Sequence, residues 1–317
     1  MDFLGIDVGK FELHAALLQG GLLARKSVPN SVKGFEQLAK WLVNRKAGEL
    51  HVCLEATGSY GVDIAEYLYD AGHLVSVVNP SQIKAFGRSM LVRTKTDSVD
   101  SEVIVRFCSE RKPLPWNPPS KEIRAFRALI RRRETLVNMI AAEKNRLEAA
   151  IDEKVVQSIT STIAMLQSQL ARLEETIESH IDGSPLLRDM VDRIDEIPGF
   201  GTLTAQKVVA ETNAFTVCEG RAEIAAYAGL NPRHYQSGTI DRRGRISKIG
   251  NVALRKALYY AALAAKKHST YFRPFVDRLK AAGKPPKVII VALMRKLLVL
   301  AQTLVANKTT FDPAFST

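Results

Sequence analysis

The segment from residue 121 to residue 181 constrains the fold most, because it contains neither glycine nor proline. Its apolar side chains recur in steps of three and four, with two interruptions between Ile123 and Ile151 and without interruption between Ile159 and Ile177. This spacing lines one side of a helix and is typical of a heptad seam. We expect two long helices, which either fold back on each other near residues 152–158 or pair between two chains.

The residues before this segment have a different period. Short apolar runs predict strands at residues 3–8, 11–17, 22–28, 51–55 and 74–78, with a hairpin turn at Gly20-Gly21. Helical spacing is expected across residues 35–43, 62–71 and 97–108. Together these elements predict a mixed sheet with covering helices. Four prolines between residues 112 and 119 exclude a helix there and mark a linker.

Residues after the long helices are again mostly helical, most clearly at 252–267 and 287–306. The expected fold is therefore α/β plus all-α. It comprises a mixed-sheet domain at residues 1–115, a proline linker with coiled-coil helices at 116–185, and a mostly helical C-terminal domain at 186–317.

Positive charge dominates the composition. Lys and Arg number 45 against 33 Asp and Glu, a net charge of +12, which favours a polyanionic partner such as nucleic acid. A run of arginines lies on the first long helix and is either a solvated face or a nucleic-acid contact; its members are Arg124, Arg127, Arg131, Arg132 and Arg133.

Secretion and membrane insertion are not indicated. The first residues lack the basic segment and cleavage site of a signal peptide. The longest apolar stretch, 288–306, is interrupted by Arg295 and Lys296 and predicts a buried helix instead of a membrane span. The three cysteines have neither zinc-site nor disulfide spacing, and we expect them in the core of a cytoplasmic protein; they are Cys53, Cys108 and Cys218.

Four carboxylates form the first candidate site. Asp7 and Glu55 each end an apolar strand, while Asp97 and Asp100 lie three residues apart at the start of a helix and share one face. Clustered carboxylates repel unless a cation neutralises them, and a pair of Mg²⁺ (or Mn²⁺) ions about 3.5–4 Å apart can polarise a phosphodiester. Taken singly, Asp97 could instead cap its helix, Asp100 could interact with the helix dipole, and Glu55 could pair with a lysine.

The segment Gly5–Gly9 bears on which class of protein the first domain belongs to. Both RNase H-like nucleases and actin-like or sugar-kinase ATPases begin with Asp-x-Gly on a first strand followed by a hairpin. Such ATPases usually have Ser or Thr after the glycine and a second glycine-rich phosphate loop. Here Lys10 follows, and the sequence contains no second loop. The nuclease interpretation is therefore favoured.

Two segments of the C-terminal part are typical of phosphate contacts. Residues 197–205 resemble a helix-hairpin-helix motif, in which Gly199 and Gly201 would expose amide groups beside a helix N-terminus; an ordinary helix–helix turn is the alternative. Residues 231–256 carry a single acid, Asp241, against seven cations. These cations are Arg233, Arg242, Arg243, Arg245, Lys248, Arg255 and Lys256.

A candidate nucleophile lies within this basic segment. Ser237 is beside Gly238 and is sterically open, and a hydroxyl among cations can attack phosphorus because the cations stabilise the developing negative charge. A Ser-Gly pair is, however, most often only a turn. Ser247 is a rival, but we expect it to cap the helix that begins near Ile249.

Seven segments together resemble one known family from end to end, in order and in spacing. They are GIDVGK, VCLEATGSYG, VNPSQIKAFGRS, RTKTDSVDSEVI, IPGFG, AGLNPR and QSGTIDRRGRISKIGN. The family is the insertion-sequence one-ten family of transposases, which contains bridge-RNA-guided recombinases. One difference is that the segment Gly238–Asp241 contains fewer glycines than the family pattern.

The resemblance implies an N-terminal RuvC-like domain with a DEDD tetrad at Asp7, Glu55, Asp97 and Asp100, and a C-terminal transposase domain whose catalytic serine matches Ser237. It implies metal-dependent, ATP-independent exchange between double-stranded target and donor DNA through a covalent serine–DNA intermediate. A structured guide RNA, a homodimer or tetramer, and a place at the bacterial or archaeal nucleoid are also implied. The expected phosphate contacts are Arg242, Arg243, Arg245 and Lys248.

Two other functions fit the same residues. A Holliday-junction-type nuclease would hydrolyse DNA with metal-bound water, would not need Ser237 and would leave no protein–DNA adduct. A non-enzymatic scaffold for RNA and DNA would tolerate alanine at each of the four acids.

Overall fold

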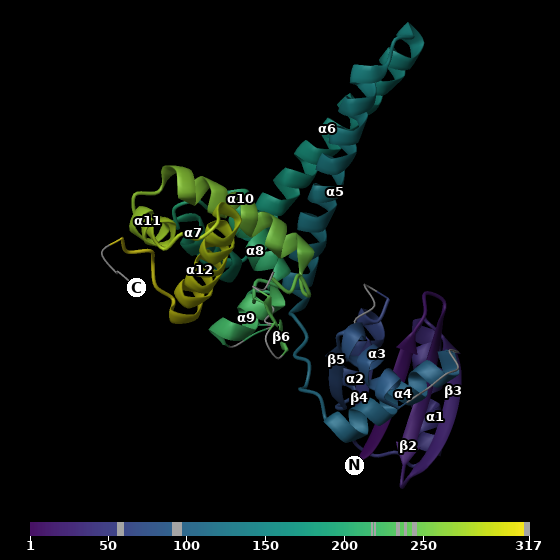
Figure 1. Cartoon of the computed structure of the whole chain (residues 1–317). Helices are drawn as coiled ribbons and strands as arrows, with labels where there is room; N and C mark the ends of the chain where they lie inside the picture. The colour runs from purple at the N-terminus through teal and green to yellow at the C-terminus, as the bar shows by residue number, and fades with distance from the viewer. Residues whose placement is uncertain are drawn as a thin grey trace. The chain divides into compact units, whose positions relative to one another are not determined.

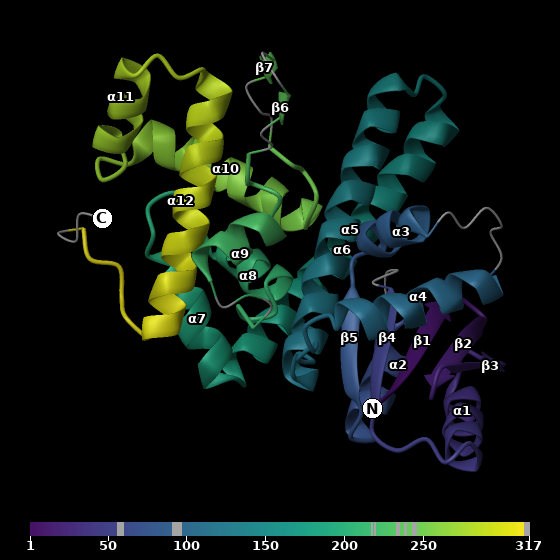
Figure 2. The same ribbon diagram turned by 60° about the horizontal axis from the view of Figure 1, so that its bottom comes forward.

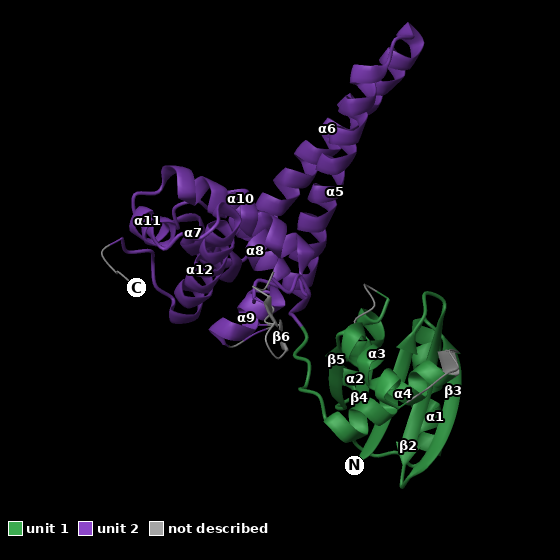
Figure 3. Ribbon diagram, in the orientation of Figure 1, with its two compact units in different colours: residues 1–118 green, residues 119–317 purple. Residues whose placement is uncertain are grey.

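The structure is a computed structural model that describes residues 1–55, 60–90, 97–216, 218, 220–232, 235–237, 240–242 and 246–313; for residues 97, 98, 235–237 and 240–242 it describes only the backbone. The chain divides into two compact units, Met1–Pro118 and Pro119–Thr317 (Figure 3). Each unit has its own core, and the two are described separately.

The first unit is built on a five-stranded mixed sheet in the order β3-β2-β1-β4-β5 (Figure 1). Its strands are β1 (Asp2–Val8), β2 (Glu12–Gln19), β3 (Leu22–Pro29), β4 (Leu50–Glu55) and β5 (Leu74–Val78). The first three are antiparallel neighbours, and β4 is parallel to both β1 and β5. Gly20 and Gly21 both have positive φ in the β2–β3 turn, as the predicted two-residue hairpin requires. The predicted mixed sheet is confirmed.

Helices cover both faces of this sheet (Figure 2). Helices α1 (Val32–Asn44) and α2 (Val62–Asp70) pack on the face that carries the even-numbered residues of β1, such as Leu4 and Ile6. Helices α3 (Pro80–Ser89) and α4 (Asp97–Arg111) pack on the other face. Sequence analysis missed α3 because only two of its side chains, Ile83 and Phe86, are buried, and this is too few to establish a period.

The second unit begins with two long helices, α5 (Lys121–Ala149) and α6 (Glu153–Asp182). They pack against each other within one chain, which decides between the two arrangements that the heptad spacing allowed (Figure 1). Asp152 ends the turn and caps α6, accepting hydrogen bonds from the amides of Lys154 and Val155. The inner half of the seam joins the main core of the unit. The outer turn is open, and Ile151 there is 98% exposed.

The other elements of this unit are α7 (Pro185–Asp195), α8 (Thr202–Glu211), α9 (Arg221–Tyr227), β6 (Tyr235–Ser237), β7 (Ile240–Arg242), α10 (Val252–His268), α11 (Arg273–Ala281) and α12 (Pro286–Asn307). Helix α12 packs on α10 in the centre of the core. Among the described residues it is the one helix long and apolar enough to cross a membrane, and half of its apolar window is buried in the core. Such burial is typical of a core helix, as the sequence predicted.

Candidate active site

Asp7 and Glu55 occupy matching positions on neighbouring parallel strands. The register pairs Ile6 of β1 with Leu54 of β4, and the two acids are the next residue on each strand. Side chains alternate along a strand, so both acids point to the face opposite Leu4 and Ile6. This is the face that α4 covers, and both acids are half-buried there.

Helix α4 runs back across this face. The Cys108 thiol, near the end of α4, donates a hydrogen bond to the His51 carbonyl near the start of β4 (3.4 Å). Further back along α4, a Cβ placed on Gly5 would lie 2.3 Å from the Val105 nitrogen and 2.6 Å from the Ser101 oxygen. The contact between β1 and α4 therefore requires glycine at position 5.

The direction of α4 brings its first turns towards the carboxyl end of β1. Asp97 is the first residue of α4 and Asp100 follows within the first turn, so the helix start is directed to the edge that carries Asp7 and Glu55. Asp100 is half-buried; the side chain of Asp97 lies outside the described residues. An ion pair between Arg25 of β3 and Glu102 fixes the second turn of α4 to the sheet.

Two cysteines occupy the sheet face next to this edge. Cys53 and Cys108 are fully buried. A hydrogen bond with Cys108, burial, and electrostatic interactions with Cys108 and the Glu55 carboxylate all raise the pKa of the Cys53 thiol. Cys53 therefore stays protonated and is unsuited to binding a metal. It is a core residue, as the sequence predicted.

The donor chemistry at the edge fits a hard cation. The described acids there, Asp7, Glu55 and Asp100, offer carboxylate oxygens, and Mg²⁺ and Mn²⁺ prefer such ligands. Among the side chains that the structure describes, no group of three or more His, Cys, Asp and Glu is arranged to hold a metal ion. Asp7, Glu55 and Asp100 thus do not form a closed ligand cluster by themselves. The side chain of the fourth acid, Asp97, is not among the described ones.

Ser237 is the last residue of β6 in a two-stranded antiparallel ribbon. It is paired with Ile240, and Arg242 of β7 is paired with Tyr235. Only the backbone of these residues is described. Gly238 and three of the predicted phosphate contacts lie outside the described residues; the three contacts are Arg233, Arg243 and Arg245.

The two ends of the segment that carries this ribbon are joined to each other. Pro232 and Ile246 form a β-bridge. The backbone N–H of Ser247 donates to the carbonyl of Asn231, and the Ser247 hydroxyl donates to the Asn231 side chain, both at 2.9 Å. The prediction that Ser247 caps the next helix is wrong. Helix α10 begins at Val252, and Asn251 caps it by accepting a hydrogen bond from the Leu254 amide.

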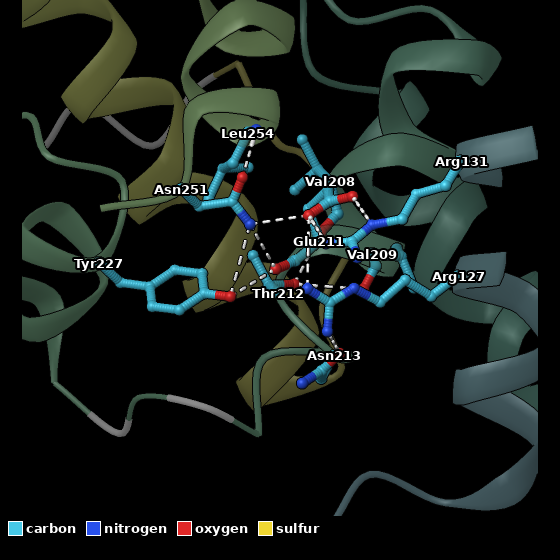
Figure 4. A network of polar contacts seen from close by, with 10 residues as sticks. All are labelled: Arg127, Arg131, Val208, Val209, Glu211, Thr212, Asn213, Tyr227, Asn251 and Leu254. Carbon is cyan, nitrogen blue, oxygen red and sulfur yellow. Dashed lines mark hydrogen bonds and ion pairs between the residues drawn. The ribbon is translucent and has the colours of Figure 1, made fainter. Parts of the chain in front are cut away.

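A buried ion-pair network anchors the C-terminal end of this segment (Figure 4). Glu211 of α8 is 1% exposed. The Nε and Nη2 atoms of Arg131 donate hydrogen bonds to the Glu211 carboxylate, at 2.9 and 3.0 Å. The side-chain amide of Asn251 donates to the same carboxylate at 2.7 Å. Burial would raise the pKa of Glu211, but the hydrogen bonds from Arg131 and Asn251 and the charge of Arg127 hold it below its usual value.

Sequence analysis missed Glu211, because one acid inside a helix gives no signal without its distant partners. The structure also gives the partners of three arginines in the run on the first long helix. Arg131 and Arg127 face Glu211, and Arg133 pairs with Glu174 of α6. These three side chains link α5 to other helices, so they do not form a fully solvated face.

The two glycines of the helix-hairpin-helix-like segment have different surroundings. Gly199 has a φ of 104°, and a Cβ there would lie 2.5 Å from the Ala265 Cβ, so packing on α10 already requires glycine. Gly201 is the N-cap of α8, and no described atom lies within 4 Å of its Cβ position. The Thr202 hydroxyl donates to Asp195 (2.7 Å), which places an acid beside this helix start. A phosphate contact at Gly201 stays a prediction.

Comparisons with known proteins match both units. A family model described as "Transposase", for DEDD transposases of IS110 elements, matches residues 4–156, and one described as "Transposase IS116/IS110/IS902 family" matches residues 191–277. The pilin gene-inverting protein of Moraxella bovis is 30% identical over 98% of this chain and 97% of its own length. A probable family 20 transposase of Pseudomonas aeruginosa is 24% identical over 98% of both chains. The transposase for insertion sequence element IS1328 of Yersinia enterocolitica is 23% identical over 82% of both.

Proposed function

The chain belongs to the IS110 family of transposases, and from that premise we propose that it cuts and rejoins DNA through a covalent bond between Ser237 and a strand end. The observation that carries the proposal is the direction of α4, whose first turns approach the strand edge bearing Asp7 and Glu55. This arrangement supports a carboxylate site for phosphodiester chemistry at residues 1–115. The nucleophile in the proposal, Ser237, belongs to the part of the chain that the second transposase family model matches.

The four acids have one role in this proposal. Asp7, Glu55, Asp97 and Asp100 would hold Mg²⁺ or Mn²⁺, which would polarise the scissile phosphodiester and stabilise negative charge on its oxygens. Glu55 and Asp7 are held by neighbouring strands, and Asp97 and Asp100 by one helix. Acids mounted on rigid elements keep their positions while the DNA strand changes place.

Ser237 has the second role. Its hydroxyl oxygen forms a bond to phosphorus as the phosphorus–oxygen bond of the DNA strand breaks, and the departing strand takes up a proton as a free hydroxyl. A hydroxyl from another strand reverses the step, so the phosphodiester's energy is retained and no ATP is needed. The cations near the serine would clamp the DNA backbone and stabilise charge in the transition state; they are Arg233, Arg242, Arg243, Arg245 and Lys248.

Rejoining is preferred to simple hydrolysis for a specific reason. The relative from Moraxella bovis is a pilin gene-inverting protein, and inverting a DNA segment requires that its ends be joined again. Hydrolysis by metal-bound water would leave the ends free. We extend this requirement to the present chain.

The partners follow from the same premise. Double-stranded target and donor DNA would be the substrates, a structured noncoding RNA would select them, and the net charge of +12 suits both. We also propose a homodimer that pairs into a tetramer on nucleic acid. Exposed apolar side chains at the open turn of the α5–α6 hairpin support self-association; they include Ile151 and Val155.

The test of the carboxylate site compares charge-removing variants. Asp7→Asn, Glu55→Gln, Asp97→Asn and Asp100→Asn should each abolish strand exchange, because each removes a ligand charge, while the variants still fold. The assay uses DNA carrying the sequences that flank the gene, with RNA transcribed from them, and sequences the joined products. Glu110→Gln, an exposed acid near the other end of the same helix, is the matched control and should retain exchange. Full activity in EDTA would contradict the proposal.

A further inference from the structure

A phenylalanine is exposed at the turn that follows Asp7. Phe11 lies between β1 and β2 and is 78% exposed. The Lys10 ammonium lies 4.9 Å from the centre of its ring, a cation–π distance. The turn therefore presents an aromatic face and a positive charge together.

Hydrogen bonds within the turn and from Asn30 fix the backbone of residues 9–12. The Gly9 amide donates to the Glu12 carbonyl (2.9 Å), which closes the turn, and the Asn30 amide donates to the Phe11 carbonyl (2.8 Å). The Asn30 side chain donates to the carbonyls of Gly9 (2.9 Å) and Tyr60 (3.0 Å). The ring is thus carried by a fixed turn, which is also linked to the chain that follows Glu55.

The position of the turn suggests its use. Phe11 is four residues beyond Asp7 and lies at the end of the sheet where β1 and β4 finish. Leu22, which is as exposed as Phe11 at 79%, lies at the opposite end of the sheet in the β2–β3 hairpin. The exposed aromatic ring and its cation are therefore at the end of the sheet that carries the acids.

We propose that Phe11 stacks on an unpaired base of the DNA strand whose phosphate lies at the four acids, and that Lys10 contacts a neighbouring phosphate. An aromatic ring offers a sequence-independent surface for any base, and a nearby cation holds the backbone. A strand that is cut and exchanged must leave its duplex, and a base stacked on a fixed ring is held in the unpaired state. This inference rests on the proposed function, since it assumes DNA at the carboxylate edge.

The test measures binding without cleavage, in EDTA. The probes are a fluorescein-labelled 30-base-pair duplex and the same duplex with six unpaired bases at one end. Wild type should bind the forked probe more tightly, and Phe11→Ala should lose roughly five- to thirtyfold on the fork while changing little on the paired duplex. Phe11→Trp should restore the preference, and Lys10→Gln should weaken binding to both probes in a salt-dependent way.

Leu22→Ala is the matched control, because it removes an equally exposed apolar side chain at the other end of the sheet; it should bind both probes as wild type does. Equal affinities of wild type for the two probes, or unchanged fork binding by Phe11→Ala, would overturn the inference. A third probe has the same fork made of RNA; a loss by Phe11→Ala confined to that probe would assign the ring to RNA and would overturn the DNA assignment. Failure of the Ser237 chemistry would leave these binding results unaffected, so the two proposals fail separately.

A crosslinking experiment locates the contact directly. The unpaired thymine nearest the fork is replaced by 5-iodouracil. The complex is then irradiated, and the protein is digested for mass spectrometry. The peptide containing Phe11 should carry the nucleotide. A crosslink found only on peptides of the second unit would contradict the inference.

Discussion

Glu211 is buried to 1% exposure and is ionised, since its neighbours hold its pKa below the usual value. A carboxylate in that setting is tolerated only because Arg131 and Asn251 satisfy it. Asn251 also caps α10 and lies four residues after Ser247, which closes the segment that carries Ser237. Glu211 of α8 thereby links α5, through Arg131, to the end of the segment that carries Ser237, through Asn251.

Glu211→Gln should therefore destabilise the second unit. The expected loss in free energy of unfolding is about 2–3 kcal/mol, below the ~3–5 kcal/mol of a fully buried pair because Arg131 is partly exposed. Urea unfolding followed by circular dichroism measures it, because both tryptophans, Trp41 and Trp116, lie in the first unit. Glu174→Gln removes a more exposed carboxylate, the partner of Arg133, and should lower the free energy of unfolding by less than about 1 kcal/mol.

The pH dependence has a defined sign. The pKa of Glu211 is lower in the folded state than in the unfolded state, so its contribution is fully present above about pH 5 and is lost as the pH falls through the folded-state pKa. The stability difference between wild type and Glu211→Gln should shrink over that acid range. A difference that stays constant from pH 7 to pH 3 would argue against an ionised Glu211.

At the scale of elements, the contact between Gly5 and α4 determines where the first turns of α4 lie relative to Asp7 and Glu55 in the proposed carboxylate site. Gly5→Ala places a methyl group 2.3 Å from the Val105 nitrogen, so α4 must move. The first unit should lose about 1–3 kcal/mol, and strand exchange should fall at least tenfold, since small displacements of catalytic groups are costly.

Tryptophan fluorescence during urea unfolding, together with the strand-exchange assay, checks this. Gly48→Ala is the control, because no described atom lies within 4 Å of its Cβ position. If Gly5→Ala exchanged strands as fast as Gly48→Ala, the position of α4 would not determine activity.

The elements also show what a sequence can specify. Short apolar runs predicted the five strands, and Gly20-Gly21 predicted the hairpin, because these signals are local. The heptad seam predicted two long helices but could not decide whether each pairs within its own chain or with another, since both arrangements bury the same stripe.

Long-range partners were beyond prediction. Ser247 and Asn251 are both good N-cap residues. Their contacts distinguish them, because Ser247 binds Asn231 whereas Asn251 accepts from the Leu254 amide. The Glu211 network joins residues 80 and 40 positions apart, and no local pattern marks it. The four acids were identified by their places at strand and helix ends together with a family resemblance; the crossing of α4 that relates them required the structure.

At the scale of the whole molecule, the proposed tetramer depends on surfaces that a single chain leaves open. Light scattering after size exclusion should give a dimer for the protein alone and a tetramer with RNA and DNA. Ile151→Glu combined with Val155→Glu should lower the oligomeric state without lowering stability, because both side chains are exposed in the single chain. A strict monomer under all these conditions would contradict the proposed oligomer.

The bond between Ser237 and DNA is the central claim, and mass spectrometry of that bond tests it most directly. Wild type is incubated with labelled DNA carrying the flanking sequences and the RNA transcribed from them, separated under denaturing conditions and digested. A protease-sensitive, slow-migrating band should appear, with a nucleotide attached to the peptide containing Ser237. Ser237→Ala should lose the band while still binding nucleic acid, since one hydroxyl adds little affinity among many phosphate contacts. An adduct that persists in Ser237→Ala, or normal strand exchange by that variant, would contradict the account.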